Sequence, residues 1–171
     1  AQGAAPTESF VVTSADGTTR TVVVTVNGSN DGPIAVADVN AITEGTTAAS
    51  ASVSGDVTPL LGTQDRDIDT GATFNVTGVV AGTAASAAGN VASVVSGTYG
   101  TVTIAADGSY TYVLDNTRNA THALAAGQVV NDIFTYTITD NNGARATTTL
   151  TIAVTGTDDA PVVTATSANV S

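Results

Sequence analysis

The residues of this chain with the clearest chemistry are aspartates gathered in short polar segments. The segment 65–71 (DRDIDTG) places three carboxylates at alternate positions ahead of a glycine, and acidic hexapeptides stand at 28–33 (GSNDGP) and 156–161 (GTDDAP). Proteins hold calcium with six to eight oxygen atoms, and clusters of carboxylates in loops supply them. The sequence therefore predicts Ca²⁺ as the bound ion.

The composition supports cation binding and argues against several other partners. Fifteen of the 171 residues are acidic, thirteen of them Asp, against four Arg and no Lys, so the net charge is −11. This charge repels nucleic acid and anionic membrane surfaces. There is no Cys for a disulfide or a cysteine-based zinc site, and no apolar run of about 18 residues that could span a membrane. We expect neither nucleic-acid binding nor membrane insertion.

Alternating apolar and polar residues dominate the elements that must position these acids. Strands are expected at 33–39, 50–57, 73–80, 101–104, 110–114, 131–139 and 146–155. Asp107-Gly108 and the segment 140–143 (DNNG) separate alternating runs, as hairpin turns do. Helical signals are confined to 116–126, and the segment 81–97 indicates a loose excursion or a weak strand.

These patterns predict an all-β fold. Many short strands, joined by closely spaced turns and each with one half-buried face, are typical of an antiparallel β-sandwich. We allow at most one short helix, of two turns. A parallel sheet is not expected, because the helical crossovers that join parallel strands are missing.

The chain also repeats itself. Residues 21–33 align with 149–161 in the strand, the acidic turn and the closing proline, and 9–17 resemble 135–143 with a hairpin two residues shorter. A unit of about 128 residues in tandem indicates an array. We therefore predict the last hairpin and linker of a preceding repeat at 1–30, one complete repeat at 31–159, and the first strand of a following repeat at 160–171.

Four separated segments resemble, in order, the VCBS repeat: 100–116, 123–128 (ALAAGQ), 132–140 (DIFTYTITD) and 156–161. VCBS repeats are cadherin-like and immunoglobulin-like modules that occur in tandem in very large secreted adhesins of Gram-negative bacteria, often of the RTX type. The resemblance covers 31–161. It implies an extracellular module on the bacterial cell surface that extends an adhesive tip, with roles in cell adhesion and biofilm formation. Its partners are then neighbouring repeats of the same polypeptide.

The resemblance also implies a metal site at the end where the chain enters the complete repeat. Asp67 and Asp69, followed by Gly71, resemble the DxDxG loop of cadherin-type repeats, and Asp140 resembles the acidic position of the last hairpin at that end. The entering linker adds further oxygen atoms. We predict one calcium site formed by Asn30, Asp31, Asp67, Asp69 and Asp140.

A second site is implied at the opposite end. Glu44 resembles the Glu that closes the first cadherin strand, Asp132 precedes the strand at 133–139, and two acids leave the repeat there. We predict that Glu44, Asp132, Asp158 and Asp159 share this site with the next repeat. Calcium at these junctions would fix the angle between neighbouring repeats, because the ion joins carboxylates of the linker to those of the domains.

Other interpretations of the same residues stay open. Acidic turns can be solvated loops that bind no metal, and a calcium-dependent carbohydrate- or ligand-binding module is the alternative function. No enzyme is expected, because neither a nucleophile elbow nor paired carboxylates in a cleft are apparent. The sequence indicates surface acids at Asp38, Asp56, Asp65 and Asp115, a turn residue at Asp107, and a surface or capping residue at His122.

The hairpin at the start of the chain raises a separate hypothesis. An isolated two-stranded hairpin is marginally stable. We therefore expect residues 1–30 to pair with something, and head-to-tail association with strand 161–165 of another copy is one possibility.

Overall fold

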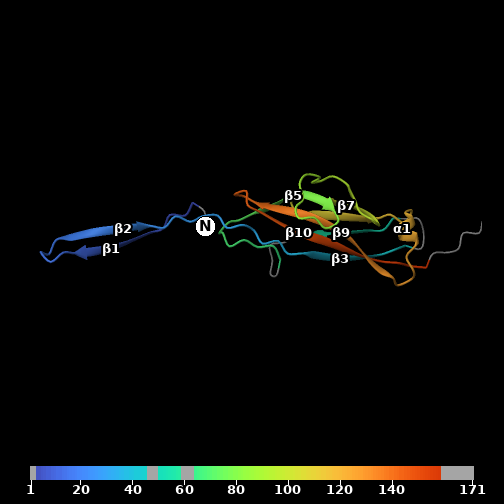
Figure 1. Ribbon diagram of the computed structural model, residues 1–171, viewed down its shortest axis with the longest axis horizontal. Coiled ribbons are helices and arrows are strands. Elements are labelled where there is room, and N and C mark those ends of the chain that lie inside the picture. Colours follow the sequence, from blue (N-terminus) through green and yellow to red (C-terminus); the bar gives the residue numbers. More distant parts are fainter. Residues whose placement is uncertain (1–2, 46–49, 59–63, 159–171) are drawn as a thin grey trace, which may run out of the picture.

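The computed structural model of this protein describes residues 3–45, 50–58 and 64–158. Within these ranges the chain forms a β-sandwich of two four-stranded sheets and a two-stranded hairpin. The hairpin lies beyond one end of the sandwich, along the long axis of the molecule (Figure 1). The fold is all-β, as the alternating pattern predicts.

The first sheet has the strand order β3-β10-β9-β5. Its members are β3 (Asp38–Thr43), β10 (Arg145–Thr155), β9 (Val129–Asp140) and β5 (Phe74–Ala81). β9 and β10 form the long hairpin that was expected on either side of 140–143. β5 pairs with the other edge of β9 and carries a bulge between Val76 and Gly78.

The second sheet has the strand order β4-β8-β7-β6. Its members are β4 (Ser52–Asp56), β8 (Ser109–Leu114), β7 (Gly100–Ile104) and β6 (Val95–Ser96). The turn between β7 and β8 confirms the role expected for Asp107, whose carboxylate accepts hydrogen bonds from Ser109 N at 3.0 Å and Ser109 Oγ at 2.6 Å. β6 is the weak strand within 81–97.

The core lies between the two sheets and follows the alternation along each strand. Alternate apolar residues of β9 and β10 are fully buried, namely Phe134, Tyr136, Ile138, Leu150, Ile152 and Val154, and the intervening Thr135 and Thr137 of β9 are buried too. The second sheet contributes Val102, Ile104, Tyr112 and Leu114, which are equally buried. The rings of Tyr112 and Phe134 meet edge to face, with centroids 6.0 Å apart. Full burial of each such side chain contributes about 1.5–3 kcal/mol, so this core dominates stability.

Two features differ from the sequence-based expectation. The strand expected at 33–39 is β3, which starts at Asp38, because Ile34 first pairs with Arg66 in an isolated bridge outside the sheet. β3 also pairs with β10 in parallel, with Asp38 opposite Leu150. These are the first and last strands of the sandwich, so the whole intervening chain serves as the crossover and no connecting helix is needed.

The remaining elements are small. The helix α1 (Asn119–His122) lies inside the region where helical signals were confined, and His122 is exposed, as expected. In the described ranges, no helix has both the length and the apolar character that a membrane crossing requires. The separate hairpin consists of β1 (Thr7–Thr13) and β2 (Thr19–Thr25), and all residues of both strands are exposed.

Candidate metal-binding ends of the sandwich

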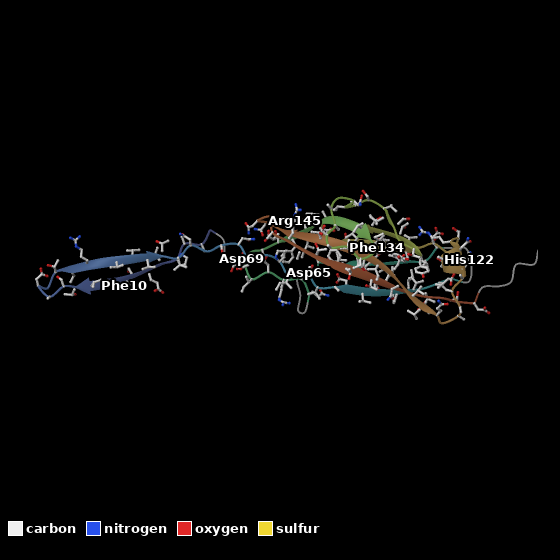
Figure 2. The ribbon with its side chains drawn as sticks, viewed as in Figure 1. Phe10, Asp65, Asp69, His122, Phe134 and Arg145 are labelled. Atoms are coloured by element: carbon white, nitrogen blue, oxygen red, sulfur yellow. The ribbon has the colours of Figure 1, made fainter. Side chains whose placement is uncertain are left out.

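The end of the sandwich nearest the hairpin, here called the entry pole, is where the linker 28–33 meets the loops 64–72 and 140–144. Figure 2 shows Asp69 and Arg145 toward this end and His122 toward the opposite one. Ile34 and Arg66 exchange two backbone hydrogen bonds, of 2.8 and 3.1 Å. The linker is therefore fixed to the loop 64–72 before the chain enters β3.

Asp140 is the centre of the contacts between the linker and the last hairpin. Its Oδ2 accepts a hydrogen bond from Asn30 Nδ2 at 2.9 Å, and its Oδ1 accepts from Asn142 N at 2.9 Å and Ala144 N at 2.8 Å. Asn142 Nδ2 donates in turn to Asn30 Oδ1 at 2.6 Å. The hydrogen bond from Asn30, joined by the backbone donors, lowers the pKa of Asp140. Asp140 is thus a carboxylate at neutral pH and links Asn30 to the sandwich.

Asp67 and Asp69 form the second half of the entry pole. Asp69 is buried, and its Oδ2 accepts a hydrogen bond from Asp31 N at 2.9 Å. Asp69 N donates to Asp67 Oδ1 at 2.8 Å, while Asp67 Oδ2 is buried without a hydrogen-bond partner. Gly71 has a φ of +80°, a conformation that glycine adopts without strain, and it turns the chain toward β5. All five residues predicted for the first site therefore lie at this pole.

The opposite end of the sandwich, here called the exit pole, contains Glu44 just after β3. The Glu44 side chain is 3% exposed. Its backbone N donates to Thr155 O at 2.8 Å, and its Oε2 accepts from Thr157 N at 3.2 Å. Glu44 Oε1 and Thr157 Oγ1 are both buried and have no hydrogen-bond partner among the residues that the structure describes. Asp158 follows and is exposed, whereas Asp159 lies outside the described residues.

Asp132 was predicted for the same site, but it has a different set of partners. Its carboxylate accepts four hydrogen bonds, from Thr98 N (2.8 Å), Tyr99 N (3.0 Å), Gly100 N (3.1 Å) and Tyr112 Oη (2.9 Å). A Cβ on Gly97 would lie 2.5 Å from both carboxylate oxygens, so only the absence of a side chain at Gly97 leaves room for the Asp132 carboxylate. The contacts make Asp132 an anchor for the segment between β6 and β7, and its role as a metal ligand stays a prediction.

Two other aspartates, expected from the sequence to be surface acids, are withdrawn from solvent, Asp65 almost fully and Asp38 in part. Asp65 is only 4% exposed, and its Oδ1 accepts a hydrogen bond from Val36 N at 2.7 Å. Asp38 accepts a hydrogen bond from Tyr136 Oη at 2.6 Å. Burial raises the pKa of Asp65, and it raises that of Asp38 to about 6. The alternation signal could not reveal them, because their partners come from other parts of the chain.

Within the described ranges, no three Asp, Glu or His side chains form a group that could hold a metal ion. The poles nevertheless have donors of the right chemistry. Among the described residues, three carboxylate oxygens are buried without a hydrogen-bond partner: Asp65 Oδ2 and Asp67 Oδ2 in the loop 64–72 of the entry pole, and Glu44 Oε1 at the exit pole. An unpaired buried charge is costly, and a hard cation would satisfy it. The poles therefore offer oxygen atoms of the chemistry that calcium prefers, but the described side chains are not gathered into a complete site.

The two-sheet sandwich, with polar loops at both ends of its long axis, is that of a cadherin-like domain. The family model of the bacterial cadherin-like domain matches residues 30–156, which are 127 of the 171 residues. The chain belongs to the bacterial cadherin-like domain family. This membership indicates an adhesion-related, extracellular module of a generally non-enzymatic kind. No curated protein matches the chain.

Proposed function

We propose that this domain is a calcium-stiffened spacer of the VCBS type in a large secreted adhesin, where it contributes to cell adhesion and biofilm formation on the bacterial surface. The observation that carries the proposal is that both poles have buried carboxylate oxygens without a hydrogen-bond partner among the described residues: Asp67 Oδ2 at the entry pole, with Asp65 Oδ2 in the same loop, and Glu44 Oε1 at the exit pole. Each stands beside the chain that enters or leaves the sandwich. A cation at these positions acts on the junctions between domains.

The mechanism is electrostatic. At the entry pole, Asn30 and Asp31 of the linker already contact Asp140 and Asp69 of the sandwich. Calcium would bind oxygen atoms of both the linker and the sandwich and would so tie the linker to the domain. Extracellular calcium modules bind with dissociation constants of about 10⁻⁴–10⁻³ M, and an ion at ten times its dissociation constant stabilises the folded state by about 1.4 kcal/mol. The junctions are then stiff in calcium-rich surroundings and slack without calcium.

A carbohydrate-binding function has less support. Six of the seven aromatic residues belong to the sandwich, and each is buried or half-buried: Phe74, Tyr99, Tyr110, Tyr112, Phe134 and Tyr136. The remaining aromatic, Phe10, is on the hairpin. The open depression beside Asp132, between β5, β6 and β9, is lined by small and polar residues with Ile133 and has no aromatic side chain. Sugar sites commonly need an aromatic platform, so the spacer function is favoured.

Unfolding with calcium or with EDTA tests the proposal through Asp67→Asn and Glu44→Gln. Each change removes the charge of an unpaired oxygen. In EDTA the variants should be at least as stable as the wild type, whereas in calcium they should lose most of the roughly 1.4 kcal/mol that one ion contributes. Thermal unfolding and calorimetric titration with CaCl₂ measure the two quantities.

Asp107→Asn is the matched control, since Asp107 is an exposed turn acid on a different loop. It should leave the calcium response unchanged. The proposal is wrong if the wild type unfolds at the same temperature in calcium and in EDTA and calorimetric titration detects no calcium binding.

A further inference from the structure

The hairpin β1–β2 has an apolar face that nothing covers within the described residues. Phe10 and Val22 lie directly opposite each other, and Val12 and Val24 continue the same face. These four side chains are 53%, 39%, 48% and 45% exposed. Glu8 and Arg20 stand at the two ends of the face. A contiguous apolar patch that is exposed in this way generally marks an interaction site.

The repeat within the sequence shows which surroundings such a face requires. Val22, Val24 and Val26 correspond to Leu150, Ile152 and Val154 of β10, through the alignment of 21–33 with 149–161. Phe10 and Val12 correspond to Tyr136 and Ile138 of β9, through the alignment of 9–17 with 135–143. All five counterparts are fully buried against the second sheet. The apolar pattern of the hairpin is thus that of a pair of core strands.

The strand edges of the hairpin β1–β2 and of the hairpin β9–β10 also differ in their pairing. The outer edge of β10 pairs with β3 in parallel, and the outer edge of β9 pairs with β5. β1 and β2 pair only with each other among the described strands. An isolated hairpin is marginally stable in water, and strands need a third partner or a packed face for independent stability. Within the part of the chain that the structure describes, the hairpin therefore has neither edge partners nor an opposing sheet.

We propose that the face formed by Phe10, Val12, Val22 and Val24 docks onto an incomplete sandwich that has the strands β3 to β8 but lacks its last hairpin. The strands come from the repeat that precedes this hairpin in the same polypeptide. A second copy of this chain cannot supply them, because its own β9 and β10 already fill that position and both neighbouring edges are paired. The hairpin is the closing element of one domain, and the linker 28–33 connects it directly to the next.

This inference concerns strand pairing and apolar packing, and it holds with or without calcium. Its test places a copy of residues 31–128, which contain β3 to β8 and α1, ahead of residue 3 of the full chain. In this chimaera the hairpin stands where β9 and β10 stand in the complete repeat. We expect amide hydrogen exchange in β1 and β2 to slow by more than about 100-fold relative to the chain alone, as expected when an exposed hairpin becomes part of a core.

Two variants and one further chimaera make the test specific. Phe10→Asp, on the docking face, should abolish the protection, whereas Val23→Thr, on the opposite face, should retain it. A chimaera that carries 31–158, with its own hairpin, ahead of residue 31 shows that the added strands can fold. If this control folds while the hairpin of the test chimaera exchanges as fast as in the chain alone, the proposal is overturned. It is also overturned if the chain alone forms a dimer that Phe10→Asp dissociates, because a second copy then covers the face.

Discussion

At the scale of single residues, the acids of this domain divide by the partners they find. Asp140 and Asp132 are surrounded by hydrogen-bond donors, whereas Asp65, Asp67 and Glu44 each have one buried oxygen without a donor among the described residues. Asp140 and Asp132 hold loops in place, and a cation would stabilise the other three most. A carboxylate in the sequence does not reveal to which group it belongs.

Asp132→Ala is expected to destabilise the domain strongly. The change leaves three backbone N–H groups, of residues 98–100, and the buried Tyr112 hydroxyl without their acceptor. The hydrogen bonds of Gly100 N and Tyr112 Oη are the buried ones, and each unsatisfied buried group costs about 1–3 kcal/mol, so a total loss of about 2–6 kcal/mol is expected. Urea unfolding measures it. Asp107→Ala, which removes an exposed turn acid, should cost about 1 kcal/mol or less by comparison. Similar losses for both variants would contradict the anchoring role.

Asp38 should make stability fall as pH rises. Burial, with the charges of Asp65 and Asp56 nearby, outweighs the hydrogen bond from Tyr136 and raises the pKa of Asp38 from 3.8 to about 6. The folded state therefore binds this proton more tightly than the unfolded state between about pH 4 and 6. The contribution of Asp38 is most favourable below pH 4 and is lost as pH rises through 6.

Asp38→Asn tests this assignment, because it keeps an acceptor for Tyr136 and removes the charge. At pH 7.5 the variant should be more stable than the wild type by about 1–2 kcal/mol, after allowance for the partial exposure of the carboxylate. The gain should shrink toward pH 4. Urea unfolding at the two pH values gives the difference, with Asp107→Asn as the exposed control. If Asp38→Asn raises the free energy of unfolding equally at both pH values, the stabilisation does not come from proton binding.

At the scale of elements, β5 depends on one glycine. Gly78 follows the bulge in β5 and pairs with Gly89 in an isolated bridge. The segment around Ala87 passes so close that a Cβ on Gly78 would lie 2.1 Å from Ala87 O and 2.5 Å from Ala88 N. This backbone covers the outer face of β9, where Thr137 Oγ1 accepts a hydrogen bond from Ala87 N at 3.1 Å.

Gly78→Ala should therefore displace that segment and destabilise the domain by about 2–3 kcal/mol, as overpacking of a tight site does. Gly32→Ala is a suitable comparison, because the nearest atom to its added Cβ is Ala144 Cβ, at an ordinary contact distance of 3.6 Å. Thermal unfolding should show little change for Gly32→Ala. An equally mild effect of Gly78→Ala would show that the segment around Ala87 adapts freely.

At the scale of the whole molecule, the two poles lie at opposite ends of the sandwich, and the hairpin extends the same long axis (Figure 1). The linker is connected to the sandwich by polar contacts of Asn30 and Asp31. A net charge of −11 adds mutual repulsion, which multivalent cations screen well. The proposed effects of calcium and of a preceding repeat both act along this axis, one through charge and the other through packing.

The sequence by itself determined the class of fold, the two sandwich hairpins and the internal repeat. Period-two alternation and turns such as Asp107-Gly108 act over a few residues, so they can be recognised without a structure. The grouping of Asn30, Asp31, Asp67, Asp69 and Asp140 at one end also followed, from the resemblance to cadherin-type repeats. The orientation of β3 did not, nor did its starting residue.

Only the tertiary structure decided which acids are buried and what they contact. Tyr136 and Asp38 lie 98 residues apart in the chain, and Asn30 and Asp140 lie 110 apart. Asp65, which looks like a loop acid, is buried against Val36 N, and Asp132 is enclosed by donors from 98–100. Burial and hydrogen bonding of a carboxylate depend on groups brought close by folding, so local pattern has no means of encoding them.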